Sequence, residues 1–101
     1  MSAFNEESQV YQSTGAITGY CVASGKAWLD SYEFRPTGVG SGGLWNGTAA
    51  ASQTQANAKA YYTDLTTGGI KPSHTFRSPV YCADGIWGVV SAGLLKVEFH
   101  R

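Results

Sequence analysis

The last quarter of the chain has the clearest alternation of apolar and polar positions. Leu95, Val97 and Phe99 are apolar, and each is followed by a polar residue. An alternation with a period of two is typical of a strand with one face buried and the other in water. Ala92-Gly93 lies just before this strand and suits a tight two-residue turn, because glycine readily adopts positive φ. We therefore expect the C-terminus to form a β-hairpin.

Short apolar stretches separated by turn residues recur along the rest of the chain. The predicted strands are Val10–Ser13, Gly15–Val22, Lys26–Arg35, Leu44–Trp45, Ala58–Leu65, Phe76–Cys82, Ile86–Ser91 and Leu94–His100. Turns at such short intervals are the signature of an antiparallel sandwich or barrel. We therefore predict an all-β fold, an antiparallel β-sandwich or small barrel of about seven to eight short strands.

The strand predicted at Lys26–Arg35 carries much of the expected core. Trp28, Tyr32 and Phe34 share one of its faces. Each aromatic side chain buries about 150–250 Å², so this face is expected to point inward. Later in the chain, Pro79 lacks a backbone N–H, and the strand that contains it is predicted to lie at an edge or to be bulged.

The middle of the chain is rich in small residues. Glycine-rich residues 36–43 are predicted to form a loop, and Asn46-Gly47 is the strongest hairpin dipeptide. Alanines in residues 48–59 favour a helix, but no large apolar residue gives such a helix a face to bury. We therefore expect a loop there that runs into the strand at Ala58–Leu65.

Length and composition favour a single β-rich domain. The 101 residues fit one domain, which we place at residues 9–101, after a flexible or partner-ordered arm at residues 1–8. Charged residues make up 14%, against roughly 25% in ordinary soluble domains. A surface with so little charge suits a protein that contacts other proteins.

Charge and hydropathy also exclude classes of partner. Seven basic and seven acidic residues give no net charge and no basic cluster, so we expect no nucleic-acid partner. No apolar run approaches the ~20 residues that cross a bilayer, so we expect no membrane partner. The polar N-terminus does not resemble a secretory signal, and we expect the chain to be made and kept in a cytosol.

The residues with reactive side chains form no recognisable chemical motif. Cys21 and Cys82 could face one another across a sandwich, but a reducing cytosol favours two free thiols. His74 and His100 lack the closely spaced partners of a structural zinc site. We therefore expect no catalytic residue, no metal site and no cofactor.

The aromatic residues are better candidates for function. Three Trp, six Tyr and four Phe exceed what a core of this size readily encloses. Aromatic side chains are also enriched at protein interfaces. We predict that Phe4, Tyr11, Trp45 and Tyr61 contact partner proteins.

The order of these features from residue 15 to residue 101 resembles the small β-sandwich structural proteins of tailed-bacteriophage particles. The residues that carry the resemblance are Leu44-Trp45-Asn46-Gly47, Pro79-Val80, Gly85-Ile86-Trp87 and Val97-Glu98-Phe99-His100-Arg101. The resemblance implies a non-enzymatic virion component, foremost a capsid decoration (cement) protein, or a neck or tail attachment protein. Such a protein acts as a homo-oligomer, binds other virion proteins, and resides in a virion assembled in the host cytoplasm.

Two other classes of function stay open. A carbohydrate-binding or host-attachment module would use exposed Trp45, Tyr61 or Trp87 as platforms on which sugar rings stack. A small enzyme would need a deep pocket with convergent titratable groups.

Overall fold

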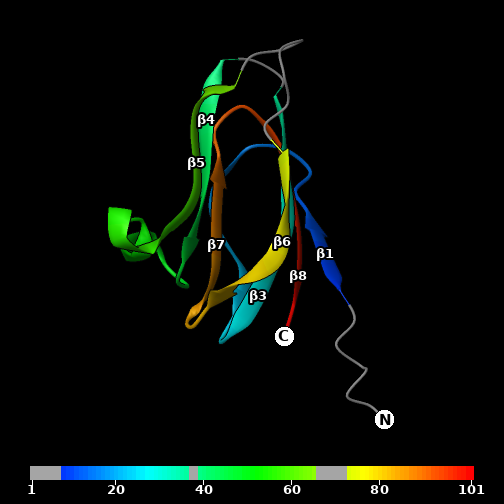
Figure 1. Ribbon diagram of the computed structural model, residues 1–101. Helices are drawn as coiled ribbons and strands as arrows, with labels where there is room; N and C mark the ends of the chain where they lie inside the picture. The colour runs from blue at the N-terminus through cyan, green and yellow to red at the C-terminus, as the bar shows by residue number, and fades with distance from the viewer. Residues whose placement is uncertain (1–7, 37–38, 66–72) are drawn as a thin grey trace.

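A computed structural model describes residues 8–36, 39–65 and 73–101, with the backbone alone described at 36 and 61–65. These residues form two antiparallel four-stranded sheets that face one another, which confirms the all-β sandwich prediction (Figure 1). The strands are β1 Gln9–Gln12, β2 Ile17–Ser24, β3 Ala27–Pro36, β4 Gly40–Asn46, β5 Ala58–Leu65, β6 Ser73–Cys82, β7 Gly85–Val90 and β8 Gly93–His100.

The strand order within the sheets is that of a jelly roll. Sheet A has the order β1-β8-β3-β6, and sheet B has the order β2-β7-β4-β5. The antiparallel pairs β1–β8, β2–β7, β3–β6 and β4–β5 are nested about the middle of the chain. This nesting corresponds to one long hairpin rolled into two facing sheets, as in jelly rolls.

Sheet membership corrects the hairpin expected at the C-terminus. β7 and β8 belong to different sheets, so the turn at Ala92-Gly93 crosses the sandwich and does not join paired strands. The turn itself lies where the sequence predicts it, with φ of +139° at Gly93. Asn46-Gly47 likewise forms no tight two-residue hairpin, because residues 47–57 separate β4 from its antiparallel partner β5. Local turn chemistry predicts where the chain bends but not which strand becomes the neighbour.

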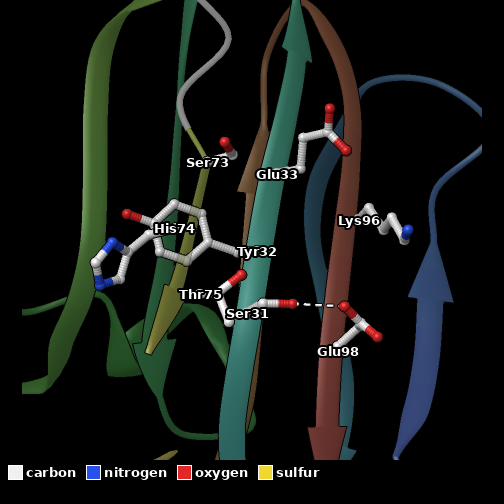
Figure 2. A pocket seen from close by; sticks show the side chains of 8 residues that line it. All are labelled: Ser31, Tyr32, Glu33, Ser73, His74, Thr75, Lys96 and Glu98. Atoms are coloured by element: carbon white, nitrogen blue, oxygen red, sulfur yellow. Dashed lines mark hydrogen bonds between the residues drawn. The ribbon is translucent and has the colours of Figure 1, made fainter. Parts of the chain in front are cut away.

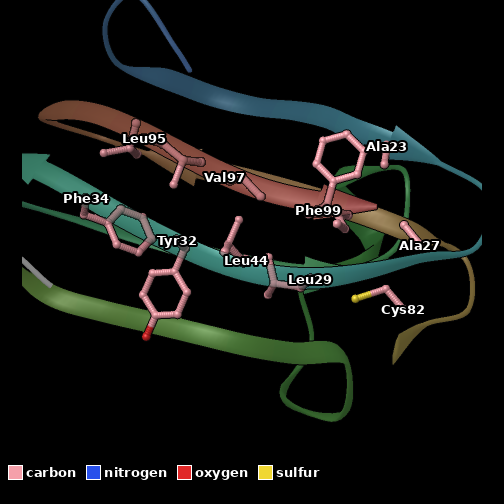
Figure 3. Packing of buried hydrophobic residues seen from close by; sticks show 12 residues of the cluster. Ala23, Ala27, Leu29, Tyr32, Phe34, Leu44, Cys82, Leu95, Val97 and Phe99 are labelled. Atoms are coloured by element: carbon pink, nitrogen blue, oxygen red, sulfur yellow. The ribbon is translucent and has the colours of Figure 1, made fainter. Parts of the chain in front are cut away.

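The core lies between the two sheets, and β8 shows its pattern most clearly (Figure 3). Leu95, Val97 and Phe99 are buried, while the polar residues between them are half-buried on the outer face of sheet A. The predicted alternation of this strand is therefore confirmed. The buried cluster comprises Ala23, Ala27, Leu29, Tyr32, Phe34, Leu44, Cys82, Ile86, Val90, Leu95, Val97 and Phe99.

A β-bulge in β3 changes which of its side chains reach the core. The register against β8 shifts at Asp30, which is an extra residue on β3. Leu29 consequently lies on the inner face with Tyr32 and Phe34, whereas Trp28 lies on the outer face. The predicted aromatic core face is thus correct for two of its rings and wrong for Trp28, because a one-residue slip exchanges the two faces.

The glycine-rich residues 40–43 belong to β4 and not to the expected loop. A Cβ at Gly42 would collide with the ring of Phe34, and one at Gly43 would collide with the ring of Trp45. The strand therefore uses glycine because aromatic rings lie directly against its backbone.

The chain between β4 and β5 is irregular, as the small-residue pattern predicts. It contains two 3₁₀ turns, η2 at Ala50–Ser52 and η3 at Gln55–Asn57, neither of which buries a residue. The Oγ1 atom of Thr54 caps η3 by accepting a hydrogen bond from the backbone N–H of Asn57 at 3.3 Å. The segment then enters β5 at Ala58, the residue that the sequence predicts.

The two cysteines are free thiols in different environments. Cys82 is buried in the core, and burial raises the pKa of its thiol, whereas Cys21 is half-buried in β2. Because the thiolate is the reactive form, we expect a thiol reagent to modify Cys21 in the folded protein well before Cys82. A mass-spectrometric time course checks this, with the unfolded protein, in which both thiols react, as control. Equal rates in the folded protein would contradict the difference in burial.

Candidate functional site

A polar groove of about 480 Å³ crosses the outer part of sheet A over β3, β6 and β8 (Figure 2). It is lined by Ser31, Tyr32, Glu33, Ser73, His74, Thr75, Lys96 and Glu98. Hydroxyl and carboxylate oxygens are frequent in this lining, and Lys96 adds a positive charge. The composition suits a ligand with many hydroxyl groups, which can both donate and accept hydrogen bonds.

The carboxylates of the groove are held by neighbouring side chains. Ser31 donates a hydrogen bond of 2.7 Å to Oε1 of Glu98. Arg35 forms an ion pair with Glu33, with 3.2 Å between Nη2 and Oε1. Figure 2 shows the two carboxylates pointing in different directions from β3 and β8. The groove therefore does not aim them at a common reacting atom.

Beside the groove, three rings form a row across sheet A. Trp28 of β3 stacks on His100 of β8, with ring centroids 5.4 Å apart and planes 7° from parallel. Tyr81 of β6 contacts Trp28 from the other neighbouring strand at 5.1 Å. Both oxygens of Asp30 lie 3.0 Å from Nδ1 of His100 and orient its imidazole. Trp28 is therefore enclosed by its neighbours, while Tyr81 at the edge of the row stays 49% exposed.

At the opposite edge of sheet A, two tyrosines close the gap between β1 and β2. The rings of Tyr11 and Tyr20 stack with centroids 4.7 Å apart and planes 13° from parallel. Burial, and then the proximity of Tyr20, raise the pKa of Tyr11. Tyr20 is 46% exposed, and Val10, on the outer face of sheet A, is 56% exposed.

We call this surface the tyrosine seam, and it comprises Gln9, Val10, Tyr11, Gln12 and Tyr20. It contains no charged side chain. It also joins the edge strands of both sheets, because β1 ends sheet A and β2 ends sheet B.

The outer face of sheet B is covered in part by the segment between β4 and β5. Trp45 is only 6% exposed. It lines a hollow of about 390 Å³ with residues of that segment, among them Gln53. Trp87 donates a hydrogen bond of 2.8 Å from Nε1 to Oε1 of Gln53. Its ring also lies against Gly19, where a Cβ would collide with it. Both indoles are therefore held by other parts of this chain.

The structure describes the side chains of two of the four residues predicted to contact partners, Tyr11 and Trp45. Tyr11 lies in the tyrosine seam. Trp45 is buried, so the expectation that it is exposed is wrong. Phe4 lies outside the described residues, and Tyr61 belongs to β5 with its side chain outside the described part.

Three exposed hydrophobic residues on edge strands were not among the sequence-based candidates. Val10 and Tyr20 are on edge strands, where side chains of either face reach solvent, and Tyr81 follows Pro79 on a third edge strand. Pro79 marks β6 as an edge or bulged strand in the sequence, so it could have pointed to Tyr81. No comparable local signal marks β1 or β2 as an edge.

Within the described ranges, no group of three or more His, Cys, Asp or Glu side chains could hold a metal ion. The same part of the chain contains no helix whose length and apolar character would let it span a membrane. No protein-family model, no curated protein and no solved structure matches the chain. Its function must therefore follow from the strand order and the surfaces described above.

Proposed function

We propose that the chain is a non-enzymatic structural subunit of a bacteriophage particle, of the capsid-decoration type, that binds neighbouring virion proteins. The observation that carries the proposal is the tyrosine seam, an uncharged and partly exposed aromatic surface. Interface cores are enriched in tyrosine and depleted of charge. Tyr20 is exposed beside Tyr11, with which it stacks, and Val10 is exposed on the opposite face of β1. Exposed apolar side chains at one edge of a domain are typical of interaction sites.

The strand order supports the same class of function. Jelly rolls occur in viral capsid proteins and in lectins. A fold alone does not determine function. The strand order is compatible with capsid proteins and with lectins, and the tyrosine seam favours binding to protein. The low charged fraction of 14% agrees with a protein that is surrounded by other subunits in a virion assembled in the host cytoplasm.

The test is co-sedimentation of the purified chain with assembled capsids and tails of the source phage. We expect the chain to sediment with one of these particles. Tyr20→Gln is expected to weaken binding about tenfold or more, as for an aromatic interface anchor. Tyr81→Gln is the matched control, because Tyr81 is also about half exposed and contacts one neighbouring ring on the far edge of sheet A.

Removal of residues 2–8 tests the proposed contribution of the N-terminal arm and of Phe4, and should also weaken binding. A chain that binds neither capsids nor tails, or that loses binding equally with Tyr20→Gln and Tyr81→Gln, would contradict the proposed function.

A second candidate function is a carbohydrate-binding or host-attachment module. It is favoured by the groove of about 480 Å³, with its hydroxyl and carboxylate lining, beside the exposed ring of Tyr81. On a glycan array this function predicts binding that is lost with Tyr81→Gln and kept with Tyr20→Gln. The same two variants therefore distinguish the two functions, because each is the control of the other.

A further inference from the structure

The four edge strands of the sandwich differ in how they are protected against pairing with another strand. Proteins usually protect such edges with bulges, prolines or charges. β2 breaks register twice against β7. β5 carries Lys59 and breaks register twice against β4. β6 carries Arg77 and Pro79 in a bulge opposite Asp30.

β1 has none of these protective features. Its four residues pair with β8 in an unbroken register, and they include neither proline nor a charged side chain. Among the described residues, only β8 pairs with it, so its other backbone edge has no partner strand.

The register shows which backbone groups face outward from β1. The N–H of Ser13 donates to the carbonyl of Leu95 at 2.9 Å, so Ser13 points toward β8. In an antiparallel pair, successive residues point their backbone groups alternately toward the neighbour and away from it. Tyr11 and Gln9 therefore bond to β8 as Ser13 does, whereas the N–H and C=O of Val10 and Gln12 point away from the sheet.

We propose that β1 pairs antiparallel with β1 of a second copy of the chain, about a two-fold axis between the two Val10 residues. Residues directly opposite in such a pair must lie on the same face, and Val10 opposite Val10 satisfies this condition. Each Val10 then offers its outward N–H and C=O to the other, and Gln12 lies opposite Ser8. The two A sheets become one continuous sheet.

A second copy fits this edge better than it fits β5 or β6. In a strand pair about a two-fold axis, the residue on the axis lies opposite its own counterpart. An axis at Lys59 of β5 or at Arg77 of β6 would therefore place like charges opposite one another. β1 meets no such penalty, because the tyrosine seam is uncharged. The pairing also covers Val10 on the outer face and approaches Tyr20 on the inner side, and both are exposed hydrophobic side chains of the seam.

The dimer adds a second copy of the chain as one partner of the tyrosine seam. The pairing itself does not depend on the proposed function; only the biological role of the dimer rests on that function.

The first test is analytical ultracentrifugation of the full chain, where we expect about twice the monomer mass of 10.7 kDa. Val10→Pro removes an outward N–H and leaves the bonds to β8 in place, so it should be monomeric. Val10→Ala keeps the N–H and should stay dimeric, with at most a few-fold weaker association. Wild-type protein that is monomeric, or a Val10→Pro variant that is dimeric, would overturn the inference.

The second test does not depend on how Val10→Pro folds. In a Cys21→Ser background, Val10→Cys should form a disulfide-linked dimer under mild oxidation, since directly opposed Cα atoms lie about 5.5 Å apart. Gln9→Cys is the matched control, because the two positions 9 would be roughly 8 Å apart, beyond the reach of a disulfide. Equal cross-linking of the two variants would overturn the register.

The two proposals fail in different ways. A dimer that binds neither capsids nor tails would keep this inference and overturn the proposed function. A monomer that binds capsids through the tyrosine seam would overturn this inference and keep the proposed function.

Discussion

Val97→Asp is expected to unfold the protein or nearly so. The side chain of Val97 is fully buried in β8, between Tyr11 of β1 and Tyr32 of β3 in the register of sheet A. A carboxylate at this position would be desolvated without a partner and would also lose the packing of the valine. We expect a loss of about 4 kcal/mol or more, a large share of the ~5–15 kcal/mol that stabilises a small domain.

Lys96→Thr is the matched control from the adjacent position of the same strand. Lys96 lies on the outer face, where it lines the polar groove, and threonine is a good strand former. Its effect should stay within about 0.5 kcal/mol. Urea denaturation followed by tryptophan fluorescence measures both variants. Equal shifts of the two midpoints would show that the faces of β8 are assigned wrongly.

β8 could be predicted from the sequence because the facing of an unbroken strand is a local property. Leu95, Val97 and Phe99 are two residues apart, and the pleat alone places them on one side. The same holds for most strand boundaries, which follow from turn residues such as Gly85 and Gly93, both with positive φ. Element type and position therefore depend on short-range chemistry that is visible in the chain.

The pairing of strands depends on contacts between residues far apart in the chain. β7 and β8 are adjacent in sequence and lie in different sheets, while β1 and β8 are at opposite ends of the chain and are neighbours. A tight turn is compatible with a hairpin and with a crossing between sheets. The jelly-roll order thus could not be read from turn chemistry.

Bulges limit what alternation can predict. Asp30 interrupts the period of β3, so Trp28 faces outward although it matches the phase of Tyr32 and Phe34 in the sequence. No residue type at this position announces the slip. The glycines of β4 are a similar case, since they read as a loop until the ring of Phe34 is seen to occupy the space above Gly42.

The residues of the tyrosine seam could be predicted from the sequence only in part. Tyr11 is recognisable as an aromatic residue near the start of the domain, and the structure places it in the seam. Tyr20 reads as an ordinary strand residue, and its exposure depends on β2 being an edge strand. Trp45 shows the opposite error, because the segment between β4 and β5 shields a ring that composition suggests is exposed.

Gly85→Ala is the second substitution with a large expected effect, a loss of about 3 kcal/mol or more. Gly85 begins β7 with φ of +140°, a conformation that residues with a Cβ rarely adopt. A Cβ there would also collide with the backbone carbonyl oxygen of Ala23, which cannot rotate away as a side chain could. A hydrogen bond also restrains the position of Gly85, because the N–H of Gly47 donates to its carbonyl at 3.1 Å.

Gly25→Ala separates the two causes of that loss. Gly25 also has a positive φ, +83°, but no atom lies within 4 Å of the position that its Cβ would take. Its replacement should cost only the conformational strain, about 1–2 kcal/mol. Urea denaturation of both variants measures the difference, which reports the collision with Ala23. If Gly85→Ala destabilises the protein no more than Gly25→Ala does, the start of β7 can shift away from Ala23. The tight connection from β6 of sheet A to β7 of sheet B would then not be a fixed constraint of this fold.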